Sequence, residues 1–315
     1  MTNFQIYKKT LSFSFVRFLI DLGAFLLMGG ITVGGLFLGN AINKEVGAII
    51  GAIVGLILGI IAMSLITFFI SNRYKAAQIA MMVKAVDEGK LPDHPYKEGK
   101  AIVKSRFKSI ALFFFITNAI KSVFKQLGRT MTGIAGAVGG EVGGSIGSAV
   151  DSAVQTLIAY LCDCCLGWVF YRSEENAAKA ALEGAAIFFK RGKTLLRNVG
   201  RIFGMGLLSL LLIGGAFTGI FYLIAIQFPT QLNQLMTMIA DERIVDYHVL
   251  GIILAAVGGL IMWGIIHTVL IRPFILTGVL KNFIIAGKEN RPTEADMAEV
   301  TRRAPKVAKL QEKME

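Results

Sequence analysis

Residues Val46 to Ser71 read VGAIIGAIVGLILGIIAMSLITFFIS, which is 26 residues without a charged side chain. A helix rises about 1.5 Å per residue, so this stretch can cross a hydrocarbon core of about 30 Å. We therefore predict a transmembrane helix. Glycine recurs in it at every fourth position, on one helical face, and a face without side chains lets another helix approach closely in lipid. The predicted packing glycines are Gly47, Gly51, Gly55 and Gly59.

The composition is that of a polytopic membrane protein. Of 315 residues, 54% are hydrophobic and 17% are charged, and the mean hydropathy is +0.63. These values exclude an ordinary soluble domain. The formal net charge is +12, but the cations cluster beside the apolar runs, where they set topology and meet anionic headgroups. The predicted partner is therefore a lipid bilayer with anionic headgroups, and nucleic acid is not expected.

Long charge-free runs predict two transmembrane hairpins, an N-terminal one over residues 1–71 and a C-terminal one over 202–271. Gly30 and Gly34 repeat the four-residue spacing and are predicted to pack helices as well. The basic linker 72–108 and the tail 272–315 carry an excess of cations. By the positive-inside rule both segments, and hence both termini, are expected in the cytosol.

The middle region, residues 109–171, allows two interpretations. Cations recur at Lys121, Lys125 and Arg129 beside several phenylalanines, which favours an interfacial amphipathic helix, although such a helix could also line a polar cavity in a bundle. A glycine row at Gly136, Gly140 and Gly144 follows, and it indicates either tight packing or a flexible loop. Because both flanks are expected in the cytosol, the region crosses the membrane twice or not at all. The chain thus has four spans, or six.

Residues 172–201 form a predicted basic amphipathic helix. Its cations recur at spacings of three and four, and its apolar residues fall largely on other faces. This pattern predicts a helix along the inner membrane surface, with an ordinary cytosolic bundle helix as the alternative. The predicted membrane-surface cations of this helix are Lys190, Lys193, Arg197 and Arg201.

The predicted fold is therefore an all-α, polytopic integral membrane protein. Glycine-zipper packing joins its hairpins, and amphipathic helices lie on the cytosolic face. The pattern GG-x-x-x-G occurs at residues 29–34 and again at 214–219, at a similar depth in each hairpin. This agreement suggests a parallel internal repeat, although glycine is common enough in spans for the pattern to arise by chance.

No enzyme motif is present, so the chain is not expected to be an enzyme, and no cofactor is predicted. Three histidines make a histidine-based metal centre improbable, and the single Cys162-Asp163-Cys164-Cys165 cluster provides too few ligands for a closed zinc site. Polar groups at bilayer depth are costly unless paired or wetted, and each is a functional candidate. The candidates are Arg17, Asp21, Asp163 and His267.

The second half resembles the choline transporter-like family over roughly residues 160–290. The resemblance rests on Leu195-Leu196-Arg197-Asn198-Val199-Gly200-Arg201-Ile202, on the preceding cysteine cluster and on Trp168. It implies passive or exchange transport of a choline-like cation. The chain departs from the family in being short, in lacking the large cysteine-bearing extracellular loop, and in offering only Trp168 and Trp263 for an aromatic cage.

Two functions from different classes follow from these observations. The first is a non-catalytic membrane scaffold or complex subunit that oligomerises through its glycine faces. The second is a transporter or channel for a small solute, which would use the intramembrane polar candidates. The small number of those candidates favours the scaffold.

Overall fold

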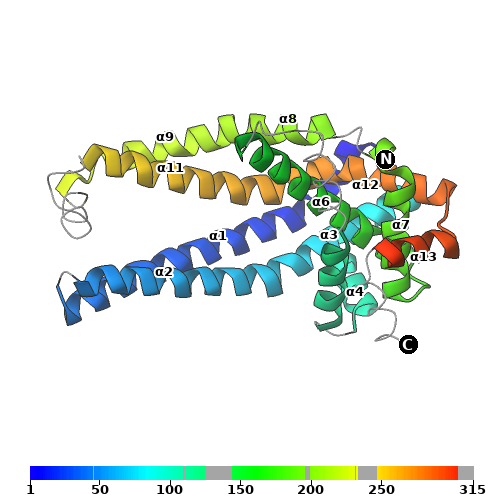
Figure 1. Ribbon diagram of the computed structural model, residues 1–315, viewed down its shortest axis with the longest axis horizontal. Coiled ribbons are helices and arrows are strands. Elements are labelled where there is room, and N and C mark those ends of the chain that lie inside the picture. Colours follow the sequence, from blue (N-terminus) through cyan, green and yellow to red (C-terminus); the bar gives the residue numbers. More distant parts are fainter. Residues whose placement is uncertain are drawn as a thin grey trace. The chain divides into compact units, whose positions relative to one another are not determined.

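The computed structural model describes residues 1–44, 46–108, 111–124, 144–195, 199–230, 232 and 247–303, and every regular element in them is a helix. Figure 1 labels these helices along the chain. Two compact units contain them. The hairpin unit comprises Ser14–Tyr74 and Gly204–Arg272, and the helical unit comprises Met1–Phe13, Lys75–Phe203 and Pro273–Glu315.

Four helices are long and apolar enough to cross a membrane, which agrees with the predicted all-α polytopic class. They are Asn3–Ile42, Val46–Asp87, Ile202–Ala225 and His248–Glu289. Two of them have 42 residues, or about 63 Å at 1.5 Å per residue, which is about twice the hydrocarbon thickness. Only part of each such helix therefore lies in lipid.

Burial shows where the helix Val46–Asp87 changes its surroundings. Its first part, α2 (Val46–Ile66), buries only Ala48, Gly55 and Gly59, and its large apolar side chains are exposed. Its last part, α3 (Asn72–Asp87), buries nine consecutive or near-consecutive residues between positions 76 and 85. Apolar side chains exposed on all sides are stable only in lipid, whereas those of α3 are covered by protein.

The first hairpin places glycine backbone against glycine backbone. Helix α1 (Asn3–Ile42) faces α2, and a Cβ added at Gly51 would lie 2.1 Å from the carbonyl oxygen of Gly35. A Cβ added at Gly47 would lie 2.2 Å from the carbonyl oxygen of Gly39. Only residues without side chains permit this approach. The partner of the glycine row of α2 is thus α1 of the same chain.

Gly30 and Gly34, predicted to pack helices too, do not take part in this contact. A Cβ added at either position meets nothing within 4 Å. The contact uses Gly35 and Gly39 instead, because these glycines lie on the side of α1 that faces α2. Among the other predicted packing glycines, Gly136 and Gly140 lie outside the described residues, and Gly144 begins a helix without a described side-chain environment.

The second hairpin pairs α8 (Val199–Ser209) and α9 (Gly215–Ala225) with α11 (Tyr247–Ile266). Close approach again depends on glycine, because a Cβ added at Gly259 would lie 2.7 Å from the backbone nitrogen of Thr218. The hairpin ends in a five-residue π-helix, η4 (His267–Ile271), as the first ends in η1 (Thr67–Ser71). A buried helix and a short helix follow each of them, an order that supports a parallel internal repeat.

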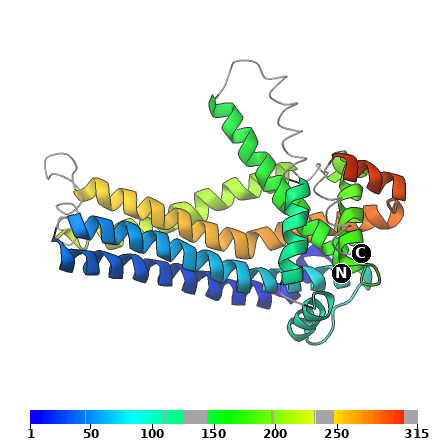
Figure 2. The same ribbon diagram turned by 60° about the horizontal axis from the view of Figure 1, so that its bottom comes forward.

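The helical unit has a core of large side chains contributed by segments far apart in the chain. Its helices include α4 (Pro95–Arg106), α6 (Gly144–Tyr171), α7 (Ala177–Leu195), α12 (Arg272–Glu289) and α13 (Glu294–Arg303), together with a helix over Ala111–Phe124. Figure 2 shows the same helices from another side. Among the most deeply buried residues are Trp168, Tyr160, Phe13, Phe124 and Phe283.

This core changes the interpretation of the middle region. The helix Ala111–Phe124 was predicted to lie at the membrane interface, but its apolar side, including Phe113 and Ile120, is buried in the helical unit. The apolar side of α7 is buried there as well, including Ile187. A face that protein already covers is not available to lipid. Both helices thus pack in the helical unit, and their location along the membrane surface stays a prediction.

Candidate functional site

One polar cluster lies where the first hairpin ends. Arg17 and Asp21, one turn apart on α1, are 3% and 6% exposed, and Ser71, the last residue of η1, is 1% exposed. The Nε of Arg17 donates to the Ser71 Oγ at 3.4 Å. Asp21 interacts electrostatically with Arg17 and by hydrogen bond with Ser71. Its Oδ1 is buried and has no hydrogen-bond partner among the described residues.

The length of α2 defines the depth of this cluster. Its 21 residues rise about 32 Å, which matches the hydrocarbon thickness. Ser71 follows after a further five residues. This count predicts that the polar side chains lie at the membrane boundary, where charged residues cost less than at the bilayer centre.

The π-helical turn accommodates polar groups at this point. A π-turn hydrogen-bonds i to i+5, widens the helix and occurs frequently at functional sites. In η1 the Nδ2 of Asn72 donates to the carbonyl oxygen of Phe68 at 3.5 Å, so a side chain supplies an additional donor to the backbone.

A second polar cluster lies at the corresponding end of the second hairpin. The Oγ of Ser209 donates to the carbonyl oxygen of Gly206 at 2.8 Å and accepts from the Trp263 Nε1 at 3.1 Å. His267, the first residue of η4, has its Nδ1 3.0 Å from the same Oγ. Because the single hydroxyl proton goes to Gly206, His267 must be the donor in this pair. Ser209 is therefore an acceptor at its His267 contact and is not activated as a nucleophile.

Asp163, the third predicted intramembrane candidate, belongs to the helical unit. It is 4% exposed and forms an ion pair with Lys75 of α3. The pair joins α6 to α3 inside the unit, and the assignment of Asp163 as an intramembrane polar residue stays a prediction. Its carboxylate is buried, and the Lys75 ammonium compensates its charge.

Glu183 is the centre of a larger polar network in the helical unit. Its carboxylate is 2% exposed, and Oε2 accepts from the Trp168 Nε1 at 3.0 Å and from the Arg172 Nε at 3.1 Å. Arg172 also donates to Glu175 at 2.7 Å. The network fastens α7 to the C-terminal end of α6. Trp168 is 1% exposed and bound to this carboxylate, so it does not contribute to an aromatic cage.

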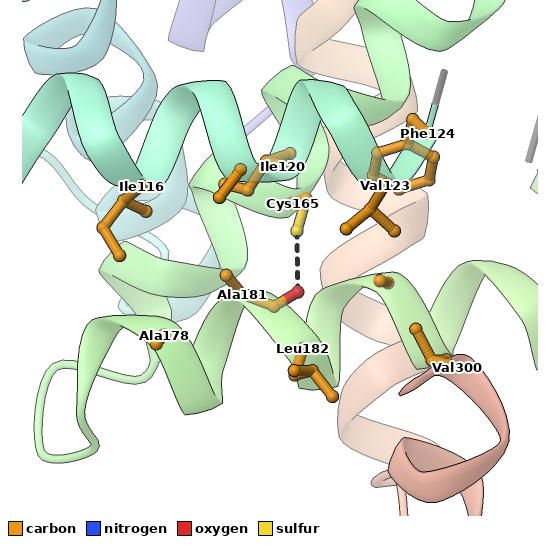
Figure 3. Close-up of a pocket in the computed structure, with 11 residues that line it drawn as sticks. Ile116, Ile120, Val123, Phe124, Cys165, Ala178, Ala181, Leu182 and Val300 are labelled. Atoms are coloured by element: carbon orange, nitrogen blue, oxygen red, sulfur yellow. Dashed lines mark hydrogen bonds between the residues drawn. The ribbon is translucent and has the colours of Figure 1, made fainter. Parts of the chain in front are cut away.

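The three cysteines are free thiols and are buried in the helical unit. The Sγ of Cys165 donates to the carbonyl oxygen of Ala181 at 3.0 Å, as Figure 3 shows. Burial raises the pKa of the Cys165 thiol well above its usual range. The apolar cavity beside it has a volume of about 20 Å³, room for about one water molecule. In the described part of the chain no group of three or more His, Cys, Asp or Glu is arranged to hold a metal ion.

The predicted membrane-surface cations have different surroundings. Lys190 forms an ion pair with Asp296 of α13 at 2.7 Å, and this hydrogen bond is the largest cause that lowers the pKa of Asp296 to about 2. Lys121 is exposed. Lys125, Arg129 and Arg197 lie outside the described residues, and for Lys193 and Arg201 only the helical backbone is described.

Sequence reasoning missed the partners that make these clusters. Glu183 had a usable signal, because it is the single acid in an alanine-rich apolar stretch from Ala177 to Phe188. Ser71 and Ser209 had no such signal, since a serine in a transmembrane helix does not stand out in the sequence. Lys75 was one of many cations in a basic linker, and only the fold brings it to Asp163.

Comparison with models of known protein families, with curated proteins and with solved structures finds no match to this chain.

Proposed function

We propose that this membrane-embedded protein is a non-catalytic scaffold or complex subunit. Its two hairpins lie in the membrane, both termini lie in the cytosol, and copies of the chain associate through glycine faces. The observation that carries the proposal is a pair of open GG-x-x-x-G faces. A Cβ added at Gly30, Gly34, Gly215 or Gly219 meets nothing within 4 Å.

These open faces differ from the glycines used within the chain. Gly47 and Gly51 already contact the backbone of α1, so they are not available to a second copy. Gly30 and Gly34 stand four residues apart on one side of α1, and Gly215 and Gly219 do the same on α9. In lipid, small residues at this spacing allow close backbone approach, which is a major source of helix association there. A second copy of the chain is the partner proposed.

The location of the polar clusters also favours a scaffold. Arg17 interacts with Ser71, and Ser209 interacts with His267, in each case between the two helices of one hairpin. Such contacts fix the two helices of a hairpin where they leave the apolar zone. Exposed cations of α1, such as Lys8 and Lys9, suit contact with anionic headgroups.

Replacement of the open glycines tests the scaffold. We expect the double variant Gly30→Leu/Gly34→Leu to lower the oligomer fraction at least tenfold in a dilution series in nanodiscs, because two leucines keep the helices apart. Analytical mass photometry of single discs measures this fraction. The matched control is Gly264→Leu, since a Cβ there also meets nothing within 4 Å and the position lies outside both patterns. A monomeric wild type, or equal oligomer fractions in all three proteins, would contradict the proposal.

A second candidate function is transport of a small solute, with a choline-like cation among the options. The observation that favours it is the buried Oδ1 of Asp21, which lacks a hydrogen-bond partner among the described residues. A buried carboxylate oxygen without a hydrogen-bond partner costs free energy unless it binds a proton or a cation. The first hairpin would then hold the transported cation beside η1.

Flux measurements test this candidate. In proteoliposomes, wild-type protein should take up radiolabelled choline above the level of empty vesicles, and Asp21→Asn should reduce that uptake at least tenfold. Asn keeps the size and removes the charge, so the fold is retained. Uptake equal to that of empty vesicles would eliminate choline transport, and uptake that Asp21→Asn leaves unchanged would remove Asp21 from the path.

A further inference from the structure

The helical unit contains a second, larger hollow, which has no role in the proposed oligomer or in transport through the hairpins. It has a volume of about 580 Å³ and is formed by α3, α4 and the C-terminal end of α6. This size is within the range of small-molecule binding sites. The residues that define its chemistry are Lys84, Asp87, Glu88, Arg106, Lys108 and Tyr171.

The acids of the hollow already have cationic partners. Asp87 pairs with Lys288 at 2.5 Å, and Glu88 pairs at 3.7 Å with Lys84, which also pairs with Glu98 outside the lining. Two cations remain. Within the described part of the chain, neither Arg106 nor Lys108 has a carboxylate within ion-pair distance. The hollow therefore has two positive charges that no acid of its lining compensates.

Arg106 is held in place by backbone. Its two Nη atoms donate to the carbonyl oxygens of Ser173 and Arg172, each at 2.9 Å, so it caps the end of α6. Burial is the largest cause that lowers the pKa of the Arg106 guanidinium. The carboxylates of Glu174 and Glu175 act on this pKa in the opposite direction. A partly desolvated cation attracts anions more strongly than one in open water.

Apolar side chains form the rest of the hollow. Val83 of α3, Ile102 of α4 and Phe170 of α6 contribute apolar surface, and the Tyr171 ring lies beside them. A ligand that matches both parts has an apolar body and a doubly charged anionic group. A phosphomonoester carries a charge of about −1.5 to −2 at pH 7, which matches two cations better than a carboxylate does.

We propose that this hollow binds the phosphomonoester group of a small amphiphilic ligand, with Lys108 and Arg106 as the cationic partners and Val83, Ile102 and Phe170 against its apolar part. Two sources share this chemistry, a soluble phosphorylated metabolite and a phospholipid whose headgroup is a phosphomonoester. Binding at this site does not depend on oligomer formation or on transport through the hairpins.

Titration calorimetry on the full chain in phosphatidylcholine nanodiscs tests the proposal, with hexyl phosphate as the probe. We expect hexyl phosphate to bind at least tenfold more tightly than hexanol or inorganic phosphate, since each of these lacks one half of the ligand. Lys108→Glu should weaken binding at least tenfold. Lys104→Glu is the matched control, because Lys104 is an exposed lysine four residues earlier, on α4, and does not line the hollow.

The source of the phosphate is decided in a second arm. Nanodiscs that contain phosphatidic acid should suppress hexyl phosphate binding if the ligand is a lipid, and should leave it unchanged if the ligand is soluble. Arg106→Gln is not used, because it also removes the cap of α6. Equal affinities for hexyl phosphate and hexanol, or equal losses in Lys108→Glu and Lys104→Glu, would overturn the proposal.

Discussion

Gly51→Leu is expected to separate the two helices of the first hairpin. Even the Cβ of the new side chain would lie 2.1 Å from the carbonyl oxygen of Gly35 and 2.9 Å from the Cα of Gly39. Both atoms belong to backbone, so no rotamer change removes the overlap. Overpacking of this kind costs about 3 kcal/mol, the upper part of the usual range. The thermal midpoint should fall by about 6–12 °C.

Size-exclusion chromatography in mild detergent measures this midpoint. The midpoint is the temperature at which heating has removed half of the monodisperse peak. Gly51→Ala should fall between wild type and Gly51→Leu, because its Cβ makes the same overlap without the rest of the leucine side chain. Gly23→Leu is the control in the same hairpin, since a Cβ there meets nothing within 4 Å and the position lies outside the proposed oligomer face. If Gly51→Leu and the wild type have the same thermal midpoint, the two glycine faces are not in contact.

Glu183→Ala should cause a loss of comparable size in the helical unit. Removing one partner of a buried ion pair costs about 3–5 kcal/mol, because the remaining charge stays buried without compensation. We expect about 3 kcal/mol, since Arg172 keeps its 2.7 Å hydrogen bond to Glu175. Glu183→Gln should cost less, because the amide oxygen still accepts from the Trp168 Nε1.

The two tryptophans allow each unit to be followed separately, since Trp168 lies in the helical unit and Trp263 in the hairpin unit. In a Trp263→Phe background, Glu183→Ala should lower the midpoint of the Trp168 fluorescence transition. In a Trp168→Phe background, the Trp263 transition should be measured for comparison. The control is Glu174→Ala, which removes an exposed acid nearby. Equal midpoints for Glu183→Ala and Glu174→Ala would show that the network does not stabilise α7.

Much of the membrane architecture could be predicted from the sequence. Runs such as Val46–Ile66 are too long and too apolar to remain stable in water, so their location follows from length and hydropathy alone. The four helices that are long and apolar enough to span confirm that reasoning.

The candidate site was only partly predictable. Arg17, Asp21 and His267 were identified because charged or titratable residues are rare in spans, and the structure places each at a hairpin end. Their partners Ser71 and Ser209 were not identified, because the register of two helices determines which serine meets them.

The sequence by itself determined the class of the protein, since uncharged runs longer than the bilayer is thick have no other stable location. It also determined that glycines recur at the spacing of one helical face. Only the tertiary structure decided which face is used, because Gly35 and Gly34 are chemically identical neighbours and differ only in what lies opposite. The same holds for Ala111–Phe124: its apolar side suits lipid and protein equally, and only the tertiary structure shows that distant residues such as Phe188 pack against this helix.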